Sequence, residues 1–154
     1  MVAWMVVLDR LPTRSRLISF GLNVESLCLL CNRGEETRGH LFFQCEFSSR
    51  LWFVSLSACG FRRSVLIWGL ELDWMCCMTR GCSLPALVLR LAWNDCIYML
   101  WRERNERVFG RAKSSVEEVF KRFQEIVRLK LSGRVKQRQL LRHSALCESW
   151  DLLV

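Results

Sequence analysis

Apolar residues recur at three- and four-residue spacing along much of the chain, and this pattern predicts a mainly α-helical fold. The pattern is clearest in residues 116–131, which predict a helix with one apolar side and one charged side. Ser114 and Glu117 predict a capping box at the start of this helix. After Gly133 we expect a helical continuation through Leu141 and a loose final stretch of about ten residues.

Pro85 opens a second long helix, which we expect to reach Phe109, because proline suits the first turn of a helix. Residues 110–113 would join the two long helices into an antiparallel hairpin. The pattern is weak in residues 62–83, which we interpret as loop with short helical turns. Three shorter helices are also predicted, at Val2–Asp9, Thr13–Phe20 and Ser48–Cys59.

These elements predict three parts: a small zinc-stabilised helical module at 1–60, an irregular connection at 61–83, and a helical hairpin with a basic extension at 84–154. Because 51% of the 154 residues are hydrophobic, the chain can bury one moderate core. Seven tryptophans and nine phenylalanines are spread along the chain, which favours core packing over a platform for stacked bases. The tryptophans expected in the core are Trp52, Trp68, Trp93 and Trp101.

Zinc is predicted for that module because four potential metal ligands follow a C-x2-C-x8-H-x4-C spacing. They are Cys28, Cys31, His40 and Cys45. Three thiolates and one imidazole fill a tetrahedral site, so it would be structural, with no open position for water or substrate. Thr37 is placed to cap a short helix carrying His40. Cys45 lies about 140° from His40 on an ideal helix, so this helix must break near Gln44.

Two other interpretations of the cysteines are weaker. The chain has nine cysteines, and the other six show no second ligand set, so the four could instead be buried thiols in a core. A disulfide framework is disfavoured because the count is odd and no secretory signal is expected. The apolar start is short and runs into Asp9 and Arg10.

The longest later apolar stretch, residues 84–101, contains Arg90, Asn94 and Asp95. Charged and amide side chains at those positions disfavour a membrane span, so no membrane partner is expected. We expect a soluble intracellular protein with reduced thiols, and composition does not distinguish nucleus from cytoplasm.

A wider set of residues around the four ligands resembles the zinc-binding domain downstream of the reverse transcriptase in plant LINE-type (non-LTR) retrotransposons. These residues are Leu11-Pro12-Thr13, Arg16-Leu17, Gly21, Glu36-Thr37, the run from His40 to Phe43, and Trp52. A later run, Trp101 to Asn105 with Val108-Phe109, resembles the segment that follows that domain. The resemblance implies zinc ligation by the same four residues. It also implies an N-terminally truncated copy, because the chain opens inside what resembles the first helix.

Catalysis is not expected from the sequence. A paired-aspartate polymerase motif, a P-loop, a dinucleotide-binding glycine fingerprint and Gly-x-Ser-x-Gly are all missing from it. His143 remains as a candidate base, and we expect it to have no catalytic role. We therefore expect a protein that is not an enzyme and has no small-molecule substrate.

The formal net charge is +8, and residues 102–154 hold thirteen basic against seven acidic side chains. This excess favours an anionic partner, and with the resemblance we expect RNA or DNA. The alternative is a solvated helix face made soluble by its charge. In the segment from Cys28 to Cys45, which we name the zinc loop, the candidate nucleic-acid contacts are Arg33 and Arg38. Phe42 and Phe43 are expected in the core. In the last third the candidate contacts are Lys121, Arg122, Arg128, Lys130, Arg134, Lys136, Arg138 and Arg142.

Two rival hypotheses assign the chain to a functional class other than nucleic-acid binding. In the first, the zinc loop and the hairpin present an apolar groove to a protein partner, as in an interaction or scaffold module. In the second, the chain is a translated retrotransposon remnant without a function. Salt-dependent binding to mixed nucleic acids separates nucleic-acid binding from the first rival.

Overall fold

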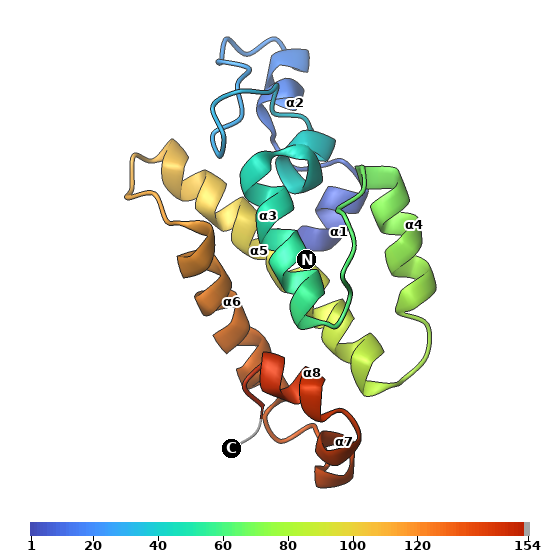
Figure 1. Cartoon of the computed structure of the whole chain (residues 1–154). Helices are drawn as coiled ribbons and strands as arrows, with labels where there is room; N and C mark the ends of the chain where they lie inside the picture. The colour runs from blue at the N-terminus through green and yellow to red at the C-terminus, as the bar shows by residue number, and fades with distance from the viewer. Residues whose placement is uncertain (153–154) are drawn as a thin grey trace.

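The computed structural model describes residues 1–152, and in this part of the chain helices are joined by loops without any β-strand (Figure 1). The only β-type pairing in the same range is an isolated antiparallel bridge between Leu27 and Glu35. The helices are α1 (Val2–Val7), α2 (Arg14–Ser19), the π-helical turn η1 (His40–Gln44), α3 (Glu46–Ala58), α4 (Trp68–Met78), α5 (Leu84–Val108), α6 (Val116–Leu131), α7 (Gln137–Arg142) and α8 (Ser144–Ser149). The predicted mainly helical fold class is confirmed.

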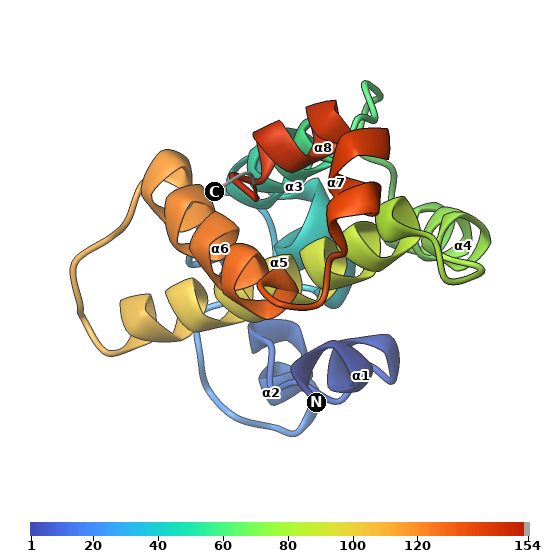
Figure 2. The same cartoon turned by 90° about the horizontal axis from the view of Figure 1, so that it is seen from below.

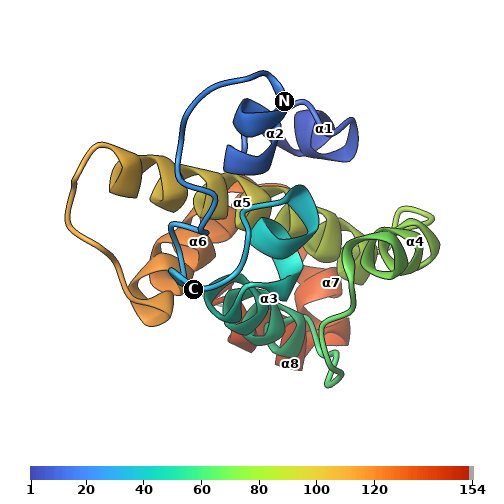
Figure 3. The ribbon, with the colours of Figure 1, turned by 90° about the horizontal axis from the view of Figure 1, so that it is seen from above.

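The 25-residue helix α5 is the central element. Its first turn contains Pro85, and Ser83 caps it by accepting a hydrogen bond from the backbone N–H of Ala86. Helix α6 returns along it, so the predicted hairpin is confirmed, and α3 packs on both. Helices α1 and α2 lie on one side of α5 and α3 lies on the other (Figures 2 and 3). Among the described helices, none is long and apolar enough to cross a bilayer.

Aromatic side chains form the core beside η1, as the sequence predicts. Phe43 packs against both Trp68 and Trp93, with ring centroids 5.5 and 5.1 Å away. Trp52 meets Trp93 edge-on at 5.5 Å. Phe42 is fully buried as well. Trp101, which we expected in the core, packs against it and is only partly buried. The buried phenylalanines therefore fill the core and are not free to stack on a base.

Residues 62–83, which we expected to be mostly loop, contain the eleven-residue helix α4. Its buried side includes a carboxylate, Glu71, which accepts hydrogen bonds from Trp52 Nε1 at 2.7 Å and from Arg63 Nη2 at 2.5 Å. Exposed apolar side chains, Ile67 and Leu70, lie at the start of the helix. Because an acidic residue is buried and apolar residues are exposed, α4 lacks the amphipathic pattern by which a helix is recognised from sequence. The predicted division of the chain at residues 60 and 84 stays a prediction.

The start of α6 is one residue later than predicted. Ser115 and Glu118 form the capping box, in place of Ser114 and Glu117. Both pairs have the required spacing, and a tertiary contact selects between them, because the backbone N–H of Ser114 donates to buried Glu103 at 2.9 Å.

The C-terminal region is more ordered than we expected. Helix α6 ends at Leu131, and residues 132–136 are not helical, so the helix expected from Gly133 through Leu141 is wrong up to residue 136. The short helices α7 and α8 follow. Trp150 is fully buried and packs edge-on against Phe123 with centroids 5.3 Å apart. This aromatic contact holds α8 against α6, which explains why most of the final ten residues are not loose. Residues 153–154 of that stretch lie outside the described part.

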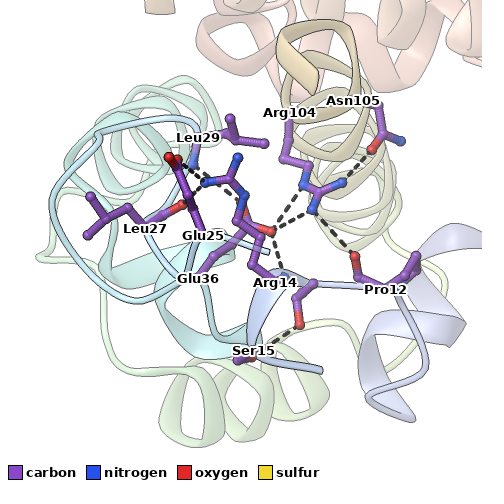
Figure 4. Close-up of polar contacts among 10 residues, drawn as sticks. Pro12, Arg14, Ser15, Glu25, Leu27, Leu29, Glu36, Arg104 and Asn105 are labelled. Atoms are coloured by element: carbon purple, nitrogen blue, oxygen red, sulfur yellow. Dashed lines mark hydrogen bonds and ion pairs between the residues drawn. The ribbon is translucent and has the colours of Figure 1, made fainter. Parts of the chain in front are cut away.

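A buried carboxylate joins three segments of the N-terminal region (Figure 4). Glu36 Oε1 accepts hydrogen bonds from Arg104 Nη2 at 2.8 Å and Nε at 3.1 Å, and from the backbone N–H of Arg14 at 3.0 Å. Its Oε2 accepts from the backbone N–H of Leu29 at 3.3 Å. Because Arg104 lies on α5, this one side chain links α5 to the start of α2 and to the Cys28–Cys31 turn.

We expect Glu36→Gln to lower the free energy of unfolding by about 3–5 kcal/mol, because it leaves the buried Arg104 guanidinium without its counter-charge. Urea unfolding followed by circular dichroism measures the change. Glu125→Gln is the matched control, since Glu125 pairs with Arg128 on the surface of α6 and its loss should change stability little. Equal stability of the two variants would contradict this role for Glu36.

Candidate metal centre

The first two cysteines lie in a tight turn. The backbone N–H of Cys28 donates to Gly34 O at 2.7 Å, and that of Asn32 donates to Cys28 O at 2.7 Å. Asn32 has a φ of 56°, in the left-handed region that asparagine tolerates better than most residues. The turn therefore reverses the chain immediately after Cys31.

The other two ligands lie at the ends of the π-helical turn. Thr37 Oγ1 accepts a hydrogen bond from the backbone N–H of His40 at 3.1 Å, so the predicted cap is present. The backbone N–H of Cys45 donates to His40 O at 2.7 Å, an i to i+5 bond that closes the π-turn. Such a turn sets residue i+5 close to residue i, which resolves the mismatch of about 140° expected for an α-helix. The helix ends at Gln44, as predicted.

The four ligand atoms fit one zinc ion. Cys28 Sγ and Cys45 Sγ are 3.9 Å apart, and Cys31 Sγ and His40 Nε2 are 3.3 Å apart. All four atoms lie within 4.8 Å of one another. Tetrahedral zinc with ordinary bond lengths requires about 3.8 Å between two sulfurs and about 3.6 Å between sulfur and nitrogen. The cluster can therefore hold zinc without a change of fold.

The protonation of these thiols differs from that of the other buried cysteines. The hydrogen bond that Cys28 donates is the largest cause lowering the pKa of Cys45, and backbone N–H groups of Ser48 and Phe47 act in the same direction. The shared hydrogen bond and burial raise the pKa of Cys28. Burial raises the pKa of Cys59 to about 12. One thiolate is thus already favoured at the metal centre, whereas Cys59 remains a neutral core thiol.

Arg107 on α5 fixes the backbone of the first turn, and sequence reasoning missed it. Its Nη1 donates to Leu30 O at 2.9 Å and to Leu29 O at 3.2 Å, the two carbonyls between the first two cysteines. Its Nε donates to Glu103 at 2.9 Å, and its Nη2 donates to Ser114 O at 3.2 Å. The available signal was a cluster of charged residues at the end of a long, otherwise apolar helix.

The basic residues predicted in the zinc loop already have partners. Arg38 Nη1 donates to Val7 O at 3.1 Å, and its guanidinium lies 4.8 Å from the ring centroid of Trp68. Arg33 is well exposed and lies 3.6 Å from Glu46. Arg38 therefore closes the C-terminal end of α1, while Arg33 remains accessible with a carboxylate beside it.

The charges on α6 balance one another. Buried residues from Val116 to Leu131 define its inner side, so helical geometry places three glutamates and three basic residues on the solvent side. These are Glu117, Glu118, Glu125, Lys121, Arg122 and Arg128. Lys130 is paired with Asp95 of α5. The solvent side of α6 thus carries little net charge.

Beyond α6 lies a segment that we name the basic segment, residues 132–147, which is followed by Glu148 and Asp151. The basic segment contains four basic residues and no acidic residue. They are Arg134, Lys136, Arg138 and Arg142, all exposed. Figure 1 shows α7 and α8 at the opposite end of the molecule from α2 and the zinc loop. The structure therefore does not bring the basic segment together with Arg33.

Comparison with known proteins agrees with the metal centre. The first 52 of the 154 residues match the model of a family described as zinc-binding in reverse transcriptase. The matched segment contains all four potential ligands. No curated protein and no solved structure matches the chain.

Gly34 leaves room for the imidazole of His40. A Cβ atom at Gly34 would lie 2.5 Å from His40 Cε1 and 2.8 Å from Nδ1, closer than atoms of a real side chain approach. We therefore expect Gly34→Ala to displace the ring and weaken zinc binding about tenfold or more, as loss of a supporting contact does at other metal sites. Competition with a chromophoric chelator measures the affinity.

Gly69→Ala is the control, because a Cβ atom at Gly69 of α4 meets nothing within 4 Å. It should bind zinc as the unaltered protein does. Unchanged zinc affinity in Gly34→Ala would argue against His40 as a ligand in this geometry.

Proposed function

We propose that this protein is a non-catalytic zinc-binding module that binds RNA or DNA, and that its first part derives from the reverse transcriptase polyprotein of a LINE-type retrotransposon. The observation that carries the proposal is the four-ligand cluster inside a segment that matches a zinc-binding reverse transcriptase family. The excess of basic side chains supports the anionic partner.

The proposed role of zinc is structural. Cys28, Cys31, His40 and Cys45 would hold it, and zinc would cross-link the turn, the π-turn and the start of α3. Four protein ligands leave no position for a reacting water, so this centre supports folding and not hydrolysis. The chain supplies the remaining support, since Arg107 binds the turn and Thr37 caps the π-turn.

Nucleic-acid contact is proposed to centre on the basic segment. Arg134, Lys136 and Arg138 are exposed and have no acidic neighbour within that segment. Lys121 and Arg122 would add weaker contacts, because glutamates share their side of α6. Arg33 and Arg128 would contribute still less, since each must give up an ion pair.

A second candidate function is protein binding, and one observation favours it. Two large aromatic side chains are exposed near the start of the chain. They are Trp4 of α1, 64% exposed, and Phe20 at the end of α2, 66% exposed. Scattered exposed apolar residues are common, but aromatic ones are enriched in protein interfaces. The nucleic-acid experiment below separates the two candidates.

We expect one zinc ion per chain in the purified protein, measured by atomic emission spectroscopy. Cys28→Ser and His40→Ala should lose it, whereas Cys76→Ser, which changes an exposed cysteine of α4, should keep it. Binding energies for structural zinc are on the order of 10 kcal/mol or more, so a chelator should unfold the N-terminal module. A zinc-free protein with the same circular dichroism spectrum and thermal stability would contradict the structural role.

Binding to a mixed-sequence single-stranded oligonucleotide, followed by fluorescence anisotropy, should weaken steeply as salt rises. We expect Lys136→Gln/Arg138→Gln to reduce the slope of log Kd against log salt by about 1.4, the value for two lost phosphate contacts. The control, Arg33→Gln/Arg128→Gln, removes the same charge from residues that already have acidic partners and should change the slope less. Absence of binding at low salt would refute the nucleic-acid proposal and favour a protein partner.

A further inference from the structure

A surface hollow lies between the C-terminal end of α3 and the turn that joins α7 to α8. Its volume is about 560 Å³, within the range of sites that bind small molecules. Arg62, Arg142 and His143 line it, together with three serines. The remaining lining residues are small or apolar, so no carboxylate of residues 1–152 lines the space.

The two arginines of this hollow are free. Neither Arg62 nor Arg142 forms a side-chain hydrogen bond or an ion pair within residues 1–152. The neighbouring Arg63 shows the contrast, because it binds both oxygens of Glu71 and its guanidinium lies 3.8 Å from the ring centroid of Trp74. Arg63 therefore has a structural role, whereas Arg62 keeps its donors available to a ligand.

In four other hollows on the surface, the cations have partners. In the one beside the zinc loop Arg33 faces Glu46. In the one beside α2 Arg38 faces the carboxylate of Asp9, and Arg16 donates to the backbone carbonyl of Asp9. In the hollow between α1 and α5, Lys130 is paired with Asp95. A fourth, between α6 and the C-terminal region, holds Arg128 with Asp151. The hollow at Arg62 and Arg142 is thus distinguished by two arginines whose side chains have no partner among the described residues.

We propose that this hollow binds a phosphate group in the backbone of a single-stranded nucleic acid. Two guanidinium groups can each offer paired N–H donors to phosphate oxygens, the geometry that arginine matches best. Ser144 adds a hydroxyl and His143 an imidazole. The hydroxyls of Ser57 and Ser149 already donate to backbone carbonyls, so they are not counted as donors here.

The position of the hollow favours a strand over an isolated phosphate. Arg142 belongs both to the hollow and to the basic segment, so the positive charge continues from the hollow along α7. Successive phosphates of one strand could therefore meet Arg62 and Arg142 first and then Arg138 and Lys136. This inference rests on the proposed function and specifies where on the molecule the strand is held.

The test compares two double variants of the zinc-loaded full chain. Arg62→Gln/Arg142→Gln removes the charge of the hollow. Arg111→Gln/Lys113→Gln removes the same charge from the exposed α5–α6 connection, where neither side chain has an ion-pair partner among the described residues. All four residues are exposed, so both variants should fold, and thermal unfolding checks this.

Anisotropy with the single-stranded oligonucleotide is measured over a series of salt concentrations. We expect the hollow variant to bind about tenfold more weakly at low salt and to lose about 1.4 from the salt slope. In the control variant we expect the salt slope to fall by less than half of this value. Titration with inorganic phosphate, followed by amide NMR, should shift resonances around residues 142–144 in the unaltered protein.

The outcomes separate the two proposals. If the hollow variant behaves as the control does while the unaltered protein binds the oligonucleotide, the hollow is not the site and the proposed function stands. If the unaltered protein binds no oligonucleotide at low salt, both proposals fail. Phosphate-induced shifts in that second case would identify a site for free phosphate and would overturn the nucleic-acid assignment.

Discussion

The arrangement of the N-terminal region depends on the buried pair of Glu36 and Arg104. Removing two charges from water is costly, and the cost is offset only when each group finds further hydrogen-bond partners. Glu36 finds them in the backbone N–H groups of Arg14 and Leu29, and Arg104 finds another in Asn105. The pair is therefore satisfied only when α2, the zinc loop and α5 are all in place, so their positions are coupled.

The C-terminal half of α5 supports the zinc loop from outside, and a zinc ion bound by the four potential ligands would hold it from within. Arg107 binds the two carbonyls between Cys28 and Cys31, and Glu103 binds both Arg107 and the chain just before α6. Leu30 of this turn is buried in the core, and the polar links from a rigid helix fix the backbone on either side of it. These links restrict the loop, so they would lower the conformational entropy that zinc must overcome when it orders the four side chains.

Features coded by local pattern were predictable, and features decided by distant contacts were not. The convergence of the four potential ligands, both long helices and the cap at Thr37 follow from spacing and residue type alone. The π-turn depends on the need for His40 and Cys45 to converge, which a helical pattern does not reveal. Helix α4 was hidden by buried Glu71, whose partners lie elsewhere in the chain, and α8 depends on the packing of Trp150 against α6.

The balance of charge on α6 has a consequence for how the molecule would meet a polyanion. With that helix nearly neutral on its solvent side, exposed cations lie at its two ends, with Arg111 and Lys113 before it and the basic segment after it. The 16 residues of α6 span about 24 Å, which exceeds the Debye length of about 10 Å at moderate salt. The two positive regions would therefore attract a strand independently of each other, so a polyanion could approach the molecule from either end of α6.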